Sequence, residues 1–297
     1  MPLWRSWMFI PGNQERKLAK AAQTEADVII YDLEDAVPIE EKKQARQMVK
    51  QALTKKNGRE TFVRINDLST PYFMDDIQEM VGYGADGIML PKTGKKEDID
   101  LVDYLLRAAE MRHGRKVGET VIMPLIESAS GLHHAFDIAK ASDRIRCLAF
   151  GSVDYTLDVY AELTKEGTEI LFARSWLVNV SRAAGIHPPI DGVYVDIQDE
   201  EGLKKEAKLI KQLGFQGKLA LHPKQNVIIN DVFLPSEEEI KLARRITQAF
   251  DEAIKQGIAA IQVNGKMVDY PVAMRARKMI EQMEALGSSE REEKRAN

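Results

Sequence analysis

The chain has 297 residues, of which 44% are apolar and 30% charged, and its formal net charge is −4 at pH 7. This is the composition of an ordinary globular protein, long enough for one large domain or two small ones. No basic run is interleaved with aromatic residues, so we expect no nucleic-acid partner. The apolar start, MPLWRSWMFIPG, is too short to span a membrane, so we expect no membrane partner. With Cys147 as the only cysteine and no secretory signal, the expected location is cytoplasmic.

Short apolar runs recur along the chain, and we expect each to form a strand. They lie at residues 7–10, 28–32, 61–65, 87–91, 121–127, 147–151, 192–196 and 218–222. Each run is nearly continuous rather than alternating, which is typical of parallel strands buried on both faces. Most of the segments between them carry a helical pattern, at 14–23, 39–56, 98–111, 168–184 and 200–213. The repeated βα order predicts an α/β fold, a (β/α)8 TIM barrel that forms a catalytic domain over residues 1–235.

A different pattern follows the eighth expected strand. Pro235-Ser236 precedes a helix expected at about 237–256, Asn264-Gly265 is a strong hairpin signal, and a last helix is expected at about 272–286. We therefore expect a C-terminal helical extension over residues 236–297. This extension is too small to supply both a helix layer for the barrel and an independent core. It should therefore pack on the barrel or on a neighbouring subunit.

Polar residues follow nearly every expected strand. In a (β/α)8 barrel the chemistry lies at the carboxyl ends of the strands. The residues expected on this rim are Asn13, Asp32, Glu34, Asp35, Arg64, Asn66, Lys92, Glu127, Asp154, Asp196 and His222. One polar strand end is weak evidence, because strand ends are polar in general. Their alignment on one rim indicates a functional site.

Two acids, Glu127 and Asp154, are expected at the ends of adjacent strands. Carboxylates with no nearby histidine or cysteine suit Mg²⁺, which takes one or two carboxylates and fills its other positions with water and substrate oxygens. A pair of helix-capping acids explains the pattern equally well. Arg64 lies inside an apolar strand, where it must be paired or face a ligand. The alternative to a ligand is a salt bridge to Asp32 or Glu34.

Ten segments follow one another along the chain: FIPGNQERKLAKA, DVIIYDLEDAV, FVRIN, GIMLPK, PLIESASGL, FGSVDYTLD, ARSWLV, IDGVYVD, GKLALHPKQ and GKMVDYPV. Together they resemble the citrate lyase beta-subunit family, part of the HpcH/HpaI aldolase group, whose relatives include malyl-CoA and citramalyl-CoA lyases. The resemblance covers residues 3 to about 285. It implies Mg²⁺-dependent cleavage of a carbon–carbon bond in a β-hydroxyacyl thioester.

The resemblance also implies roles for particular residues. Glu127 and Asp154 match the metal ligands, and Arg64 matches the residue that binds the carbonyl and carboxylate end of the substrate. Glu34 and Asp35 match acids that hold metal-bound waters, while Asp32 should brace Arg64 or the end of its strand. One departure affects substrate preference: many relatives read G-A-E-D where this chain has Gly151-Ser152-Val153-Asp154.

Three basic residues are candidates for binding the substrate or coenzyme A. Arg16 and Lys17 lie in the expected first turn of a helix after Pro-Gly-Asn, where they would hold CoA phosphates. Ordinary solvation of a surface explains these two as well. Lys92, in GIMLPK, is the third candidate.

Asp269 lies far beyond the last barrel strand. It is explained most simply as a capping acid before Pro271. The resemblance instead implies an acid/base at the acetyl methyl carbon, supplied by a neighbouring subunit. The chain would then be a homo-oligomer, which we expect to be a trimer, with sites completed in trans.

The sequence therefore supports two hypotheses of different classes. The first is a Mg²⁺-dependent lyase that forms or cleaves a CoA or acyl-carrier thioester, with glyoxylate, pyruvate or oxaloacetate as the 2-oxo acid; a thioesterase on the same substrate class is its near alternative. The second is a citrate lyase beta subunit that has no activity outside a complex. The metal ligands and Arg64 favour the enzyme.

Overall fold

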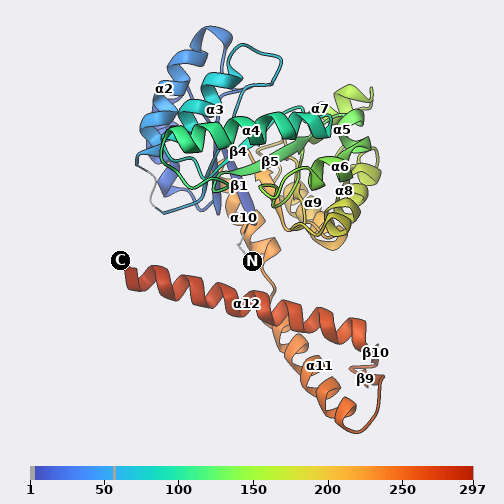
Figure 1. Cartoon of the computed structure of the whole chain (residues 1–297). Coiled ribbons are helices and arrows are strands. Elements are labelled where there is room, and N and C mark those ends of the chain that lie inside the picture. The colour runs from blue at the N-terminus through green and yellow to red at the C-terminus, as the bar shows by residue number, and fades with distance from the viewer. Residues whose placement is uncertain (1–3, 56–57, 297) are drawn as a thin grey trace. The chain divides into compact units, whose positions relative to one another are not determined.

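The computed structural model describes residues 4–55 and 58–296, with side chains up to residue 281 and at 283 and 284. The chain divides into two compact units (Figure 1). One is Trp4–Phe233, and the other contains the chain from Leu234 onward. In the first unit the strands alternate with helices, and in the second two long helices are joined by a hairpin.

Eight parallel strands of the described chain close into a barrel in sequence order, with β1 paired to β8. They are β1 (Ser6–Pro11), β2 (Val28–Asp32), β3 (Thr61–Arg64), β4 (Gly87–Leu90), β5 (Val121–Ile126), β6 (Ala149–Phe150), β7 (Ile190–Asp191) and β8 (Gly217–Ala220). The prediction of a (β/α)8 TIM barrel with a C-terminal helical region is confirmed.

Helices and short 3-10 turns follow the strands. They are α1 (Glu15–Lys20), η1 (Ala21–Gln23), η2 (Ile39–Glu41), α2 (Lys42–Leu53), α3 (Phe73–Gly82), α4 (Lys96–Arg112), α5 (Ala129–His133), α6 (Ala135–Lys140), α7 (Ser152–Asp158), α8 (Leu171–Ala184), α9 (Glu200–Leu213) and α10 (Pro223–Phe233). The five helices expected within this unit form where the periodicity placed them, with ends shifted by up to three residues.

Two apolar layers show how the barrel strands are oriented. One cluster, which includes Phe9, Val28, Ile30 and Phe62, fills the barrel interior. A second and larger cluster lies between the barrel and its helices. Successive side chains of a strand point to opposite faces, so alternate residues of each strand belong to the two clusters. This alternation also decides which polar side chains reach the mouth of the barrel.

The expected seventh strand at 192–196 is wrong, because β7 is Ile190–Asp191. Asp191 is fully buried and accepts hydrogen bonds from Arg174 Nε (2.8 Å) and Lys218 Nζ (2.7 Å). An apolar pattern cannot reveal a strand whose outward residue is a carboxylate neutralised by partners distant in sequence. Asp196 therefore ends no strand: it lies exposed before α9, with Oδ2 3.5 Å from Lys165 Nζ.

The C-terminal unit is built from α11 (Glu237–Lys255), the hairpin β9 (Ile261–Val263) and β10 (Lys266–Val268), and α12 (Tyr270–Ala296). Ser236 and Glu239 form a capping box on α11. The hairpin turns through Asn264 and Gly265, both at positive φ, as the sequence predicts. Phe250, Val263 and Val268 pack into a small core. That this unit packs on the barrel or on a neighbouring subunit stays a prediction.

None of the helices in the described part of the chain has the length and apolar character needed to cross a membrane.

Candidate active site

Alternation along the strands places three charged groups at the mouth of the barrel. Val28 and Ile30 point into the barrel, so Asp32 continues the same face at the carboxyl end of β2. Phe62 and Arg64 share the inner face of β3, and Leu125 and Glu127 continue that of β5. Apolar residues thus fill the lower layers, and charged residues form the top layer.

Asp32 and Arg64 form the central pair of this layer. They lie side by side in the parallel register of β2 and β3. Arg64 donates from Nε to Asp32 Oδ1 (2.8 Å) and from Nη2 to Oδ2 (2.6 Å), a two-pronged contact that fixes the plane of the guanidinium. Its carbon Cζ lies 4.8 Å from the centre of the Phe9 ring. The expectation that Asp32 braces Arg64 is confirmed.

The charge of Arg64 is stabilised by its surroundings. Burial opposes the guanidinium charge, but the carboxylates of Asp32, Glu34 and Asp35 outweigh it and raise the pKa of Arg64. Arg64 therefore remains a cation that holds its geometry without a ligand. The salt bridges to Asp32 and Glu34, which the sequence offered as the alternative to a ligand, are both present. They do not use all the N–H donors of the guanidinium, so Arg64 can still bind a ligand.

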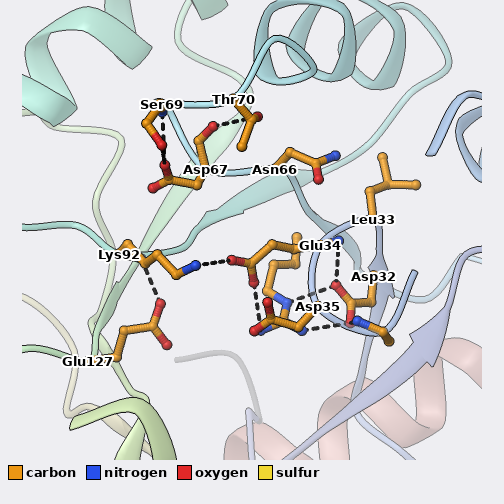
Figure 2. Close-up of polar contacts among 12 residues, drawn as sticks. Asp32, Leu33, Glu34, Asp35, Asn66, Asp67, Ser69, Thr70, Lys92 and Glu127 are labelled. Atoms are coloured by element: carbon orange, nitrogen blue, oxygen red, sulfur yellow. Dashed lines mark hydrogen bonds and ion pairs between the residues drawn. The ribbon is translucent and has the colours of Figure 1, made fainter. Parts of the chain in front are cut away.

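Glu34 lies beside two cations, Arg64 and Lys92, and Figure 2 shows its contact with Lys92. Its Oε2 is 3.0 Å from Arg64 Nη1, and its Oε1 is 3.3 Å from Lys92 Nζ. Neither approach has the geometry of a hydrogen bond, so both buried oxygens of Glu34 keep their capacity to accept one. Burial raises the pKa of Glu34, against the opposing effect of Arg64. Asp35 is more exposed and lies 3.8 Å from Arg64 Nη1.

Lys92 connects Glu34 to Glu127. It follows β4 in a left-handed conformation, with φ of 51°, which a residue with a side chain rarely adopts. Its backbone N–H donates to Glu127 Oε1 over 2.7 Å, while its ammonium faces Glu34 (Figure 2). The sequence suggested only a substrate contact for Lys92. Its backbone role was not foreseen, because no residue type signals a left-handed lysine.

Glu127 is a buried carboxyl group with an unusual proton affinity. It is 4% exposed and lies against Gly151, where an added Cβ would come within 2.5 Å of its side chain. A residue larger than glycine at position 151 would therefore displace the carboxylate. Burial, together with the charges of Asp154 and Glu34, raises the pKa of Glu127 to about 8. A cation beside this carboxylate would stabilise its ionised form.

Asp154 does not end a strand, as the sequence suggested, but lies in the first turn of α7. The strand β6 ends at Phe150, and Gly151 joins it directly to the helix. Asp154 is partly exposed and close enough to Glu127 to raise its pKa. Among the side chains that the structure describes, no group of three or more His, Cys, Asp and Glu residues has metal-binding geometry. This finding is compatible with Mg²⁺, which needs only one or two carboxylates.

The remaining candidate residues lie outside this cluster. Arg16 and Lys17 are exposed on α1, which follows the carboxyl end of β1. Asp269 belongs to the C-terminal unit and joins β10 to α12. Its Oδ1 accepts a hydrogen bond from the backbone N–H of Val272 (3.3 Å), which is the capping contact that the sequence allowed. A cap does not preclude a second role for an acid at this position.

Comparison with known proteins identifies the family. Residues 5–223 match the model of the HpcH/HpaI aldolase/citrate lyase family. The chain belongs to this family. It is 41% identical over 280 residues to the citrate lyase subunit beta of Leuconostoc mesenteroides subsp. cremoris, covering 94% of this chain and 92% of that one. The predicted membership of this family and the predicted lyase class of the enzyme are confirmed.

Other relatives show how function varies within the family. The L-malyl-CoA/beta-methylmalyl-CoA lyase of Rhodobacter capsulatus is 34% identical, covering 94% of each chain. The (3S)-malyl-CoA thioesterase of Cereibacter sphaeroides is 33% identical, covering 96% of each.

The crystal structure of CitE from Mycobacterium tuberculosis, in complex with magnesium, acetoacetate and coenzyme A, is similar to this fold. The TM-score is 0.78 at 29% sequence identity, covering 93% of this chain and 97% of that one.

Proposed function

We propose that this chain is a Mg²⁺-dependent carbon–carbon lyase acting on a β-hydroxyacyl thioester of coenzyme A or an acyl carrier. The products would be a 2-oxo acid and an acetyl thioester, and the reverse reaction would condense them. The observation that supports this proposal most directly is the top layer of the barrel. There Arg64, held by Asp32, lies near the buried acid Glu127.

The residues present fit a magnesium ion. Glu127 and Asp154 are oxygen donors, and the proximity of Asp154 contributes to the raised pKa of Glu127, an electrostatic cost that a divalent cation would remove. The charge of Arg64 lowers the pKa of Glu127 only in part, because Arg64 is bonded to Asp32, and the ammonium of Lys92 faces Glu34. Glu34 has free acceptor capacity to orient water around the ion, with Asp35 nearer the solvent. When bound, Mg²⁺ would supply Lewis-acid polarisation of the substrate oxygens.

Arg64 is suited to hold the carboxylate end of the substrate. A guanidinium has five N–H donors, and two of those of Arg64 are bonded to Asp32. Donors on Nη1 and Nη2 remain to bind a carboxylate in a two-pronged contact. Because Asp32 fixes the plane of the group before the substrate arrives, little ordering is needed on binding.

The chemistry balances without a further reactant. Loss of the hydroxyl proton lets the carbon–carbon bond break, and the hydroxyl-bearing carbon becomes the carbonyl of the 2-oxo acid. The electron pair of the broken bond passes to the α-carbon of the thioester as an enolate. One proton delivered to that carbon gives the acetyl thioester. Arg64 would offset the negative charge of the oxo-acid fragment throughout.

Asp269 is our candidate for the acid that exchanges this last proton. It lies in the C-terminal unit rather than in the barrel. We propose that it reaches the site of a neighbouring subunit, so that the active form is a homo-oligomer, specifically a trimer.

Arg16, Lys17 and Lys92 are our candidates to bind the phosphates or the thioester arm of coenzyme A.

A thioesterase is the alternative, favoured by the similarity to the malyl-CoA thioesterase. It would act on the same substrate class and differ in letting water attack the thioester carbonyl. A complex-dependent citrate lyase beta subunit is the second alternative, favoured by the similarity to the Leuconostoc subunit.

One experiment separates these functions. The purified chain is incubated with Mg²⁺, acetyl-CoA and glyoxylate, pyruvate or oxaloacetate in turn, and thioesters and free CoA are measured by mass spectrometry. A lyase gives a new thioester without release of CoA, and EDTA stops the reaction. Release of free CoA from the new thioester identifies a thioesterase. No turnover with any of the acids, despite Mg²⁺ binding, favours the complex-dependent subunit.

A further inference from the structure

A cavity of about 380 Å³ lies outside the barrel, between α1 and α2. Its floor is the outer face of β2 and the start of β3, including Ile29, Tyr31 and Thr61. The helix α1 is only six residues long, and it and the turn η1 that follows present small side chains, Ala19 and Ala22, to the cavity. This volume is within the range of small-molecule sites. The cavity shares none of its lining residues with the charged cluster at the barrel mouth.

Tyr31 gives the cavity a polar group without a partner. Its side chain is 4% exposed and lies on the outer face of β2, with its neighbours in the layer between the barrel and the helices. Among the residues that the structure describes, none forms a hydrogen bond with its hydroxyl, and the hydroxyl oxygen is not among the fully enclosed atoms, so it is accessible from the cavity that Tyr31 lines. Burial raises the pKa of Tyr31, so the phenol remains a neutral donor. A ligand in the cavity would satisfy this hydroxyl.

The two ends of the cavity carry opposite charges. Arg59 and Lys55 line the end where β3 begins, and Glu15 lies on the first turn of α1. Arg59 uses Nη1 to bond the carbonyl and hydroxyl oxygens of Thr24, and its other guanidinium nitrogens have no bond within the described residues. An anionic group would therefore bind at the Arg59 end and be repelled at the Glu15 end.

The strand register sets the length of a suitable ligand. Tyr31 pairs with Val63, four residues beyond Arg59, which corresponds to roughly 13 Å along the strand. Leu18, Ile29 and Met48 provide apolar walls to the cavity.

We propose that this cavity binds a small amphipathic monocarboxylate. Its carboxylate would lie on Arg59 and Lys55, its apolar chain along the walls of the cavity, and a hydroxyl or carbonyl oxygen at Tyr31.

A titration of the full-length protein with 10-hydroxydecanoate, followed calorimetrically, tests this site. Its chain of about ten carbons matches the span from Arg59 to Tyr31. Saturable binding to one site per chain is expected, with decanoate binding more weakly because it lacks the hydroxyl. Tyr31→Phe should weaken 10-hydroxydecanoate about fivefold and leave decanoate unchanged, since only one neutral hydrogen bond is lost. Arg59→Gln should weaken both ligands at least tenfold.

Two further variants test whether the ligand binds in this cavity rather than elsewhere on the protein. Ala52→Leu fills the cavity and should abolish binding of both ligands, while Arg107→Gln, at an exposed arginine on α4, should change neither. Circular dichroism checks that each variant is folded. The assay requires neither Mg²⁺ nor turnover, so its result is independent of the proposed lyase activity.

Three outcomes would overturn the inference. The first is absence of saturable binding to the wild type. The second is binding that persists unchanged in Tyr31→Phe, Arg59→Gln and Ala52→Leu, which places the ligand elsewhere. The third is competitive displacement by coenzyme A, which would make the cavity part of the thioester site.

Discussion

The backbone N–H of Lys92 donates a hydrogen bond to Glu127 Oε1 over 2.7 Å. The donor residue has φ of 51°, a left-handed conformation that costs a residue with a Cβ about 1 kcal/mol. The same residue directs its ammonium toward Glu34. A single residue thus orients one carboxylate through its backbone and offsets the charge of another through its side chain.

We expect Lys92→Gly to be more stable than Lys92→Ala by about 1 kcal/mol, because glycine adopts a positive φ without steric cost. Both variants remove the ammonium and both keep the N–H, so their difference isolates the backbone. Urea denaturation measures it. The same pair of changes at Lys205, inside α9, should give the opposite order, since glycine weakens a helix. Equal stability of the two Lys92 variants would show that the left-handed backbone is not strained.

The sequence could predict the barrel because its inner and outer faces are both apolar, which gives the strands a continuous pattern. It could also place Glu127 and Arg64 on the rim, since strand ends converge there. It could not predict β7, whose Asp191 is neutralised by Arg174 and Lys218 from other elements.

Other features of the site depend on geometry that composition does not record. Residue type does not reveal that Lys92 is left-handed or that Gly151 makes room for Glu127. Asp154 lies in α7 rather than at a strand end because this helix begins at Ser152, directly after Gly151. The apolar run 147–151 gave no sign that a helix follows it so closely.

Glu127→Gln and Asp154→Asn should each reduce Mg²⁺ affinity at least tenfold and abolish turnover, because each removes a charged oxygen ligand. Both replacements preserve side-chain shape, so the fold should be retained. Calorimetric titration of Mg²⁺ measures the affinity, and Glu162→Gln, at an exposed acid after α7, serves as the control. Equal Mg²⁺ affinity of the wild type and the three variants would show that Glu127 and Asp154 are not ligands of the metal.

Magnesium binding should release a proton from Glu127. With a pKa of about 8, the metal-free carboxyl group is mostly protonated at pH 7, and a cation requires the ionised form. Mg²⁺ affinity should therefore rise with pH up to about 8 and then level off. Titrations at pH 7 in two buffers of different ionisation enthalpy should report about one proton released per ion. Glu127→Gln should release none, and a wild type that releases none would contradict the role of Glu127.

Arg64→Lys should weaken binding of the 2-oxo acid by one to two orders of magnitude, roughly the loss of a charge-assisted hydrogen bond. Lysine cannot bond Asp32 and a substrate carboxylate with two planar contacts at once. Affinity for coenzyme A should stay within about twofold, since Arg64 is assigned to the other end of the substrate. Separate titrations with oxaloacetate and with coenzyme A measure the two effects. If only the affinity for coenzyme A fell, Arg64 would have been assigned to the wrong end of the substrate.

Asp269→Asn should retain the fold, Mg²⁺ binding and coenzyme A binding but lose turnover. Asparagine keeps an oxygen that can accept the N–H of Val272, so the cap on α12 survives while the proton-carrying carboxylate is lost. Exchange of the acetyl protons of acetyl-CoA with deuterated water, followed by mass spectrometry, should stop as well. A purely structural Asp269 would leave both turnover and exchange intact.

If Asp269 acts in trans, mixing inactive Asp269→Asn chains with inactive Glu127→Ala chains should restore part of the activity. A mixed oligomer contains some sites that combine an intact barrel with an intact Asp269 from a neighbour, so the recovered activity should depend on the mixing ratio. Light scattering establishes the oligomeric state, and mass-tagged chains verify that subunits exchange. Absence of recovery despite verified exchange, or full activity of a monomer, would disprove the shared site, because each barrel would then have to use its own Asp269 or none.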